Sequence, residues 1–261
     1  MLGRLVVLAL LLFMTLPTVV VIVASFNPTA ILSFPPQGLS LRWYENALTY
    51  PQFRKAAVNS VIVTAASAAL ALPIGTAAAL ALVRHAPRGG ALWNAAILSP
   101  LVIPGVAAGL GFLILAAKLG LLQSRWILVT AHVVLVLPFV VRSVVVSVAN
   151  LDPMLERAAA SLGAGPWRTF RRVTLPLLRP GLFAAFLFAV IVSVNEFVVS
   201  LFVTNRVTEI LPVAMFSYVV NYTDPTMAAL STLFIVATFV VVAVADRLLN
   251  LSRIFQIGDR H

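Results

Sequence analysis

The sequence predicts an all-α membrane protein with six transmembrane helices. The chain has 261 residues, of which 61% are hydrophobic and only 10% are charged, and its mean hydropathy is +1.06. A soluble protein of this length needs far more polar surface to cover its core. Long stretches also lack any Asp, Glu, Lys or Arg, as between Lys55 and Arg84. A helix of about 20 apolar residues crosses the hydrocarbon core of a bilayer.

These stretches give the positions of the six predicted spans. They cover residues 5–25, 57–83, 93–117, 126–147, 181–204 and 227–246. The first is longer than the apolar region of a signal peptide, and no A-x-A cleavage site follows it, so we interpret it as a retained span. Because the chain shows no long repeat, low-complexity tract or linker, residues 1–261 are expected to form one domain.

The basic residues are distributed unevenly between the two sides of the predicted bundle. With the N-terminus inside, twelve of the eighteen Lys and Arg residues lie in cytoplasmic segments and six lie outside. This bias predicts that both termini are cytoplasmic. The formal net charge of +10 is not read as a nucleic-acid signal. In so apolar a chain it indicates loops that face anionic lipid and a partner subunit.

The sequence contains no pattern for catalysis, metal binding or nucleotide binding. It has no cysteine, and its three histidines are far apart and form no H-E-x-x-H motif. The only lysines, Lys55 and Lys118, do not follow a glycine, so the chain lacks the P-loop that would hold the phosphates of ATP. No G-x-S-x-G elbow occurs. We therefore predict no catalytic residue, no cofactor and no metal in this chain.

The cytoplasmic loop 148–180 is the most informative segment. Asp152 followed by Pro153 is a helix-start signal, with a capping side chain and a proline in the first turn. An alanine-rich stretch then favours a helix, which Gly163 is expected to end. Pro166 can open a second short helix. On these grounds alone the loop is equally compatible with an ordinary amphipathic connection between two spans.

The same loop resembles a known motif. Ala158-Ala159, then Gly163 and later Val173-x-Leu175-Pro176, is similar to the EAA loop of binding-protein-dependent ABC importer permeases. The resemblance implies a coupling helix that sits in a cleft of an ATP-binding subunit and transmits that subunit's movement. The residues that it assigns to this coupling are Glu156, Arg157, Ala158, Ala159, Leu162, Gly163 and Pro176.

One position departs from the motif. Arg157 stands where the motif has glutamate, and the nearest acid, Glu156, comes one residue earlier. Successive residues of a helix differ by about 100° in direction, so Glu156 cannot occupy the face of the motif's acid. A contact with the ATPase that depends on that acid is therefore not expected to form in the usual way.

The resemblance extends over nearly the whole chain. Phe34-Pro35-Pro36, Leu137-Pro138, Asn195-Glu196 and Asp224-Pro225 are similar to the second permease of spermidine/putrescine-type transporters. The resemblance implies the type I importer fold in a bacterial inner membrane, in which this chain pairs with a second permease, preferably as a heterodimer. A dimer of ATP-binding subunits would hold ATP and Mg, and a periplasmic binding protein would deliver a polyamine-like cation. Relatives of this branch also carry phosphonates, opines and other small solutes.

Glu196 is the candidate residue for the solute path. A carboxylate near the middle of a span is costly unless it faces a bundle interior or an aqueous pathway. Three other polar residues recur with it at intervals of three and four, which predicts one shared helical face: Ser193, Ser200 and Thr204. We assign Ser193, Asn195, Glu196 and Ser200 to a path for a cationic solute. The alternative is a structural hydrogen bond or an ion pair, either with Arg142 or with a partner chain.

Other residues suggest packing rather than transport. Gly75 and the Gly105-x-x-x-Gly109 pattern predict close contacts between helices. His132 is expected to be a hydrogen-bonded residue of the bundle. The prolines within the spans are expected to kink them: Pro73, Pro100, Pro104 and Pro138. Two other kinds of protein remain possible, a secondary transporter, which should carry an internal repeat, and a membrane scaffold, which needs no coupling loop.

Overall fold

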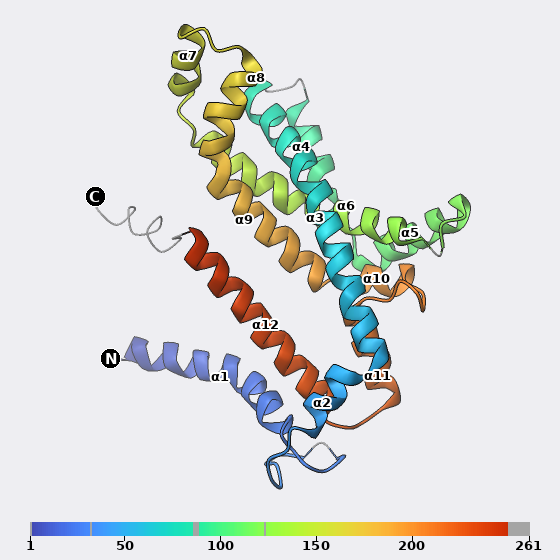
Figure 1. The fold of residues 1–261 in the computed structure, drawn as a ribbon. Coiled ribbons are helices and arrows are strands. Elements are labelled where there is room, and N and C mark those ends of the chain that lie inside the picture. Colours follow the sequence, from blue (N-terminus) through green and yellow to red (C-terminus); the bar gives the residue numbers. More distant parts are fainter. Residues whose placement is uncertain (1, 32, 86–88, 123, 250–261) are drawn as a thin grey trace. The chain divides into compact units, whose positions relative to one another are not determined.

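The computed structural model describes residues 2–249 except 32, 86–88 and 123, and every regular element in this part of the chain is a helix (Figure 1). The longer elements are α1 (Leu2–Ala24), α3 (Pro51–His85), α5 (Gly105–Leu119), α6 (Arg125–Ala149), α9 (Leu175–Val194), α11 (Leu211–Asn221) and α12 (Thr226–Leu249). The shorter ones are α2 (Arg42–Thr49), α4 (Gly90–Leu98), η1 (Ser99–Leu101), α7 (Pro153–Ser161), α8 (Pro166–Thr169), η2 (Phe170–Thr174) and α10 (Val198–Val203). The all-α prediction is confirmed.

Four helical stretches of the described residues are long and apolar enough to cross a membrane. They are Gly3–Ala24, Pro51–His85, Arg125–Ala149 and Pro166–Asn195, and they correspond to the first, second, fourth and fifth predicted spans. α12 covers the sixth predicted span, 227–246. The apolar side chains of α1 are exposed along most of its length, as suits a helix whose neighbours are lipid. The C-terminal end, predicted to be cytoplasmic, lies outside the described residues.

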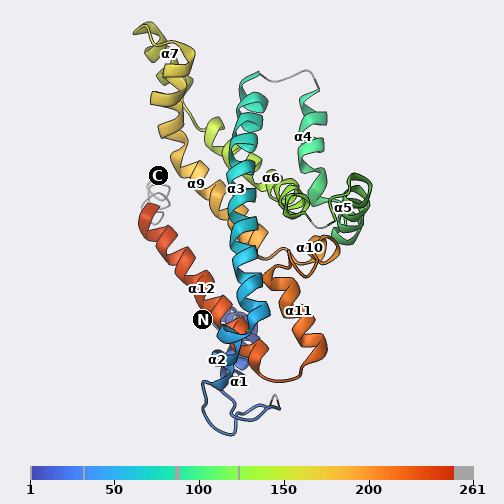
Figure 2. The ribbon, with the colours of Figure 1, turned by 45° about the vertical axis from the view of Figure 1, so that its right-hand side comes forward.

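The third predicted span, 93–117, is bent, and the interruption lies where Pro100 and Pro104 were expected to kink it. α4 and η1 end before Pro104, and α5 leaves at an angle of 95° to them (Figure 2). Proline lacks the N–H that would continue the helical ladder, and it disfavours helical backbone in the residue before it. Pro104 caps α5 with an extended backbone, ψ 133°. Pro73 and Pro138, by contrast, lie within the continuous helices α3 and α6.

The fifth predicted span, 181–204, is also interrupted. α9 begins earlier, at Leu175, and ends at Val194, and the short helix α10 starts only at Val198. No proline or glycine causes this break. Asn195 donates from its side chain to the carbonyl of Ile191 at 2.8 Å, and the Glu196 carboxylate accepts from the N–H of Val199 at 2.8 Å. Such local bonds satisfy the backbone without a continuous helix.

The contacts divide the chain into two units, Met1–Arg54 with Ala214–His261, and Lys55–Val213. The prediction of a single domain stays a prediction. In the smaller unit, α2 and α12 pack together, and α1 also packs on α12. The buried indole of Trp43 donates to the carbonyl of Asn27 at 2.6 Å, and the Tyr218 hydroxyl donates to Asp224 at 2.9 Å. These bonds fix the loops at one end of the unit's helices.

In the larger unit, α6 packs along α9 and against α3, and small residues allow the close approach. A Cβ on Gly75 would lie 2.5 Å from Cγ1 of Val140, and one on Gly181 would overlap the side chain of Ser147. The buried members of this cluster include Ala68, Ala71, Val136, Val140, Val144, Leu178, Ala185 and Ala189. Because lipid tails are as apolar as these side chains, close packing rather than water exclusion holds such helices together.

A second apolar cluster joins α5, α6 and α10, where α10 crosses the two glycines of the predicted small-residue motif. A Cβ on Gly105 would lie 3.1 Å from Cγ1 of Val198, and one on Gly109 would lie 2.5 Å from a ring carbon of Phe202. The predicted packing role of these glycines is confirmed.

Gly109 and Gly111 of α5 provide a matched test of this packing. A Cβ on Gly111 would meet nothing within 4 Å, so Gly111→Ala should raise the stability by up to about 1 kcal/mol, through helix propensity. Gly109→Ala gains the same propensity but crowds Phe202, and overpacking costs about 1–3 kcal/mol. Thermal unfolding of both variants in detergent should give shifts of opposite sign. Equal shifts would contradict the proposed contact between α5 and α10.

Candidate functional site

The loop 148–180 forms the helix that the sequence predicts, beginning with its cap. Asp152 accepts a hydrogen bond from the N–H of Met154 at 2.8 Å, and Pro153 occupies the first turn of α7. The carboxylate satisfies one of the free N–H groups of the first turn and interacts favourably with the helix dipole. The predicted start of the helix is confirmed.

Gly163 ends α7 as expected. Its φ of +82° lies in the left-handed region, which a residue with a Cβ rarely adopts. The N–H of Gly163 donates to the carbonyl of Ala160 at 2.9 Å, and that of Ala164 donates to Ala159 at 3.1 Å. These two bonds are a Schellman motif, which reverses the chain and satisfies the last carbonyls of the helix.

The chain leaves the turn through a second short helix, as predicted. α8 starts at Pro166, continues into the π-helical turn η2, and runs without interruption into α9. Pro176 lies in the first turn of α9. A movement of the loop is therefore passed directly to a membrane-length helix, because no flexible linker separates them.

Glu156 holds α7 against the rest of the larger unit. Its Oε1 accepts hydrogen bonds from the guanidinium of Arg84, at the end of α3, and from the hydroxyl of Thr174, at the end of η2. Both side chains of the ion pair are about one-third exposed. We call this arrangement the clasp: Arg84, Glu156 and Thr174. Sequence reasoning missed it, because 72 residues separate the two charges.

The outer surface of α7 is apolar and uncovered. No residue of α7 is buried, and Met154, Leu155 and Leu162 are 68%, 46% and 89% exposed. Ala158 is exposed and Ala159 is half-buried, while Arg157 is exposed. A helix that leaves several large apolar side chains uncovered indicates a surface for a partner.

The polar residues of the predicted solute path fall into two groups. Ser193 and Ser200 are buried and bond to the two ring nitrogens of His132, at 2.8 Å from Nδ1 and 2.9 Å from Nε2. Ser193 also donates to the hydroxyl of Thr64 at 3.1 Å. His132 is only 1% exposed, and a neutral imidazole can donate through one nitrogen and accept through the other. The expectation that His132 is a hydrogen-bonded residue of the bundle is confirmed.

Glu196 does not share a helical face with Ser193 and Ser200, and that prediction was wrong. The spacing argument assumed a continuous helix, but the helix breaks between Val194 and Val198. The carboxylate of Glu196 caps α10 through the N–H of Val199, and the side chain stays half-buried. Asn195 beside it is exposed. Among the described residues Glu196 forms no ion pair, so the alternative partner Arg142 is not used.

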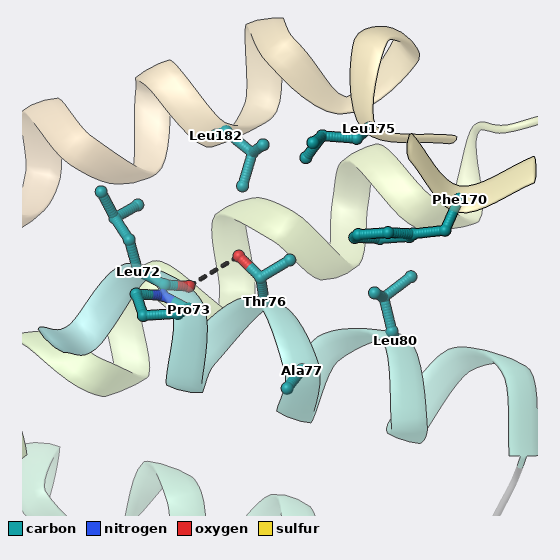
Figure 3. Close-up of a pocket in the computed structure, with 8 residues that line it drawn as sticks. All are labelled: Leu72, Pro73, Thr76, Ala77, Leu80, Phe170, Leu175 and Leu182. Atoms are coloured by element: carbon teal, nitrogen blue, oxygen red, sulfur yellow. Dashed lines mark hydrogen bonds between the residues drawn. The ribbon is translucent and has the colours of Figure 1, made fainter. Parts of the chain in front are cut away.

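Two cavities are found in the larger unit. One, of about 400 Å³, lies between α3, η2 and α9, and its walls are almost entirely apolar (Figure 3). Its one hydroxyl, on Thr76, donates to the carbonyl of Leu72 at 2.6 Å, and no charged side chain lines the cavity. The other, of about 270 Å³, lies beside the clasp and includes Ala160 and Phe170 in its walls. Within the described residues no group of three or more His, Cys, Asp or Glu could hold a metal.

Comparison with known proteins gives consistent results. The family described as "Binding-protein-dependent transport system inner membrane component" matches residues 2–252. The "Spermidine/putrescine transport system permease protein PotC" of Escherichia coli is 30% identical over 93% of each chain. The "Putrescine transport system permease protein PotI" of Escherichia coli is 32% identical, over 88% of this chain and 84% of the relative.

The fold has a solved counterpart. A chain of a bacterial ABC transporter "involved in the import of the acidic polysaccharide alginate" superposes with a TM-score of 0.74 over 94% of both chains, at 17% sequence identity. At this identity the likeness shows the fold alone. The type I permease fold predicted from the sequence is confirmed.

The clasp can be tested by exchanging its charges. Arg84→Glu or Glu156→Arg alone places like charges together and should loosen α7, at a cost of about 1 kcal/mol or more for a pair that is about one-third exposed. The double variant restores an ion pair and should recover part of the loss. Hydrogen exchange of the α7 amides in the purified protein measures this. Exchange that is equally fast in the double and single variants would contradict the clasp.

Proposed function

Because this chain belongs to the family of binding-protein-dependent transport system inner membrane components and is the permease of an ABC importer, we propose that it carries a polyamine-like cation across the inner membrane. The names of the two relatives support this substrate class. At about 30% identity a phosphonate, an opine or another small solute is the second candidate. The family membership decides against the secondary transporter and the scaffold that the sequence left open.

One observation carries the proposed mechanism: α7 is a capped helix with an uncovered surface that is fastened at Glu156 to α3 and to η2, which continues into α9. When an ATP-binding subunit closes on its nucleotide, it would move α7. The clasp would then transmit the displacement to two long helices at once, and the path would switch between outward- and inward-facing states. ATP and Mg would be bound by that subunit, since this chain has no P-loop lysine.

The remaining partners follow the same proposal. A dimer of ATP-binding subunits would dock on the cytoplasmic side, a second permease would complete the path, preferably as a heterodimer, and a periplasmic protein would deliver the solute. Both chain termini would be cytoplasmic, as the distribution of basic residues supports. Glu196 and Asn195, at the break between α9 and α10, would offer polar groups to the solute.

A glycine pair tests the coupling loop. Gly163→Leu forces a side chain into the left-handed region, at about 1–2 kcal/mol, and should misdirect the chain after α7. Gly165→Leu is the control, because Gly165 has a φ of −68° and a Cβ there would meet nothing within 4 Å. We expect Gly163→Leu to insert normally but to lose its ATPase subunit or its stimulation by loaded binding protein in nanodiscs. Ala159→Trp should act like Gly163→Leu, since a bulky side chain at this position would keep α7 from entering the cleft of the ATPase subunit.

Wild-type behaviour of both Gly163→Leu and Ala159→Trp, in ATPase co-purification, stimulation and transport, would contradict a role of this loop in coupling. Loss of coupling in Gly165→Leu to the same degree would show that any bulky side chain in the loop is harmful. The conformational argument for Gly163 would then be wrong.

Glu196 separates capping from solute recognition. Glu196→Gln keeps the oxygen that accepts from Val199 but removes the charge, whereas Glu196→Ala also removes the cap, which costs about 1 kcal/mol. We expect Glu196→Gln to unfold at the wild-type temperature yet to lower uptake of labelled putrescine in proteoliposomes several-fold. Glu196→Ala should lower both. Wild-type uptake by Glu196→Gln would show that this residue only caps α10.

A further inference from the structure

We propose that the cleft that receives α7 presents a carboxylate to Arg157, so that the charge at this junction is reversed relative to a cleft that receives a glutamate. This inference rests on the proposed function, because it concerns the ATP-binding partner. It assigns the kind of surface that fits this chain.

The first step is that Glu156 is not available to a partner. Its Oε1 already accepts from Arg84 and from Thr174, and the side chain is directed toward the ends of α3 and η2. To reach a partner it would have to leave both donors and separate a partly buried ion pair. Removing one partner of such a pair is strongly unfavourable when the remaining charge stays buried. The only acid within α7 therefore serves the permease itself.

The second step concerns what α7 shows to the outside. Arg157 follows Glu156 and points about 100° away from it around the helix. It is exposed, and no described acid forms an ion pair with it. The only other acid at this helix, Asp152, is engaged with the N–H of Met154. The exposed surface of α7 is therefore apolar with a single positive charge.

The residues that follow α7 also carry positive charge. α8 and η2 continue the loop with three exposed arginines that form no ion pair within the described residues: Arg168, Arg171 and Arg172. A partner surface with a basic residue opposite Arg157 would bring like charges together in a partly desolvated contact, which is strongly unfavourable. A carboxylate there would instead form a charge-assisted, bidentate pair with the guanidinium. Charge complementarity thus favours an acidic cleft.

The lysine content of the chain allows a direct test. Its only lysines, Lys55 and Lys118, both lie in segments predicted to be outside the cell. An Arg157→Lys variant therefore places one reactive side-chain amine on the cytoplasmic side. In the intact complex, co-purified with its own ATPase and treated with a zero-length carbodiimide, this amine should form an amide with an Asp or Glu of the ATPase. Peptide mass spectrometry locates that residue.

Arg179→Lys is the matched control, because Arg179 is likewise an exposed arginine but belongs to α9 and not to α7. It should give no amide with the ATPase. Equal yields from the two variants, or an Arg157→Lys complex that retains its ATPase without coupling to it, would overturn the inference.

Charge reversal supplies the second measurement. Arg157→Glu should lower the amount of co-purified ATPase about tenfold or more, and replacing the coupled ATPase carboxylate with arginine should restore it. If Arg157→Glu retains as much ATPase as wild type, the inference is wrong while the proposed function stands. If the wild-type chain retains no ATP-binding subunit even at low salt, the proposed function itself fails, and this inference fails with it.

Discussion

The constraint on which this structure depends is that backbone groups within the hydrocarbon core find no water, so each interruption of a helix must satisfy its own N–H and carbonyl groups. Two breaks in the described part of the chain illustrate it. At the end of α9, Asn195 bonds the carbonyl of Ile191, and Glu196 bonds the N–H of Val199. At the bend before α5, Ser99 donates to the carbonyl of Ala96 at 2.8 Å. The polar side chains at these two breaks therefore have a structural role, whatever else they do.

Hydrogen bonds and close helix contacts link the cytoplasmic loop to the interior of the larger unit. The clasp joins α7 to α3 and to η2, which continues into α9. Both α3 and α9 meet α6, where Gly75 and Gly181 allow close contact. Deeper in the bundle, His132 of α6 bonds the hydroxyls on either side of the break between α9 and α10. A displacement of α7 thus acts on helices that meet near the hydrogen-bonded cluster of His132, Ser193 and Ser200. This is a contiguous physical connection, and functional coupling along it requires that the cluster have two arrangements.

Local signals in the sequence predicted what local physics controls. The cap at Asp152, the left-handed turn at Gly163 and the small-residue contacts of α5 could all be read from residue types, because each depends on one or two turns of helix. The break after Val194 could not be predicted. It depends on side chains that bond to backbone groups in place of the helical hydrogen bonds, and neither hydropathy nor residue spacing reveals such bonds. The clasp was equally hidden, since its charges lie in different helices and the sequence gives no distance between them. The 95° bend was signalled by Pro100 and Pro104, but the size of an angle depends on packing and not on the prolines alone.

The one-residue offset between Glu156 and the motif's glutamate illustrates how helix geometry separates two functions. On one face of α7 a carboxylate secures the helix to its own chain, and about 100° away a guanidinium is left for a partner. Had both charges been on the outer face, they would have neutralised each other, and α7 would lack its ion pair to α3. With the acid turned inward, the helix is rigidly attached and its outer surface keeps one uncompensated charge. Under the proposal above, attachment and recognition rest on adjacent residues, so Arg157 can be replaced without breaking the ion pair of Glu156.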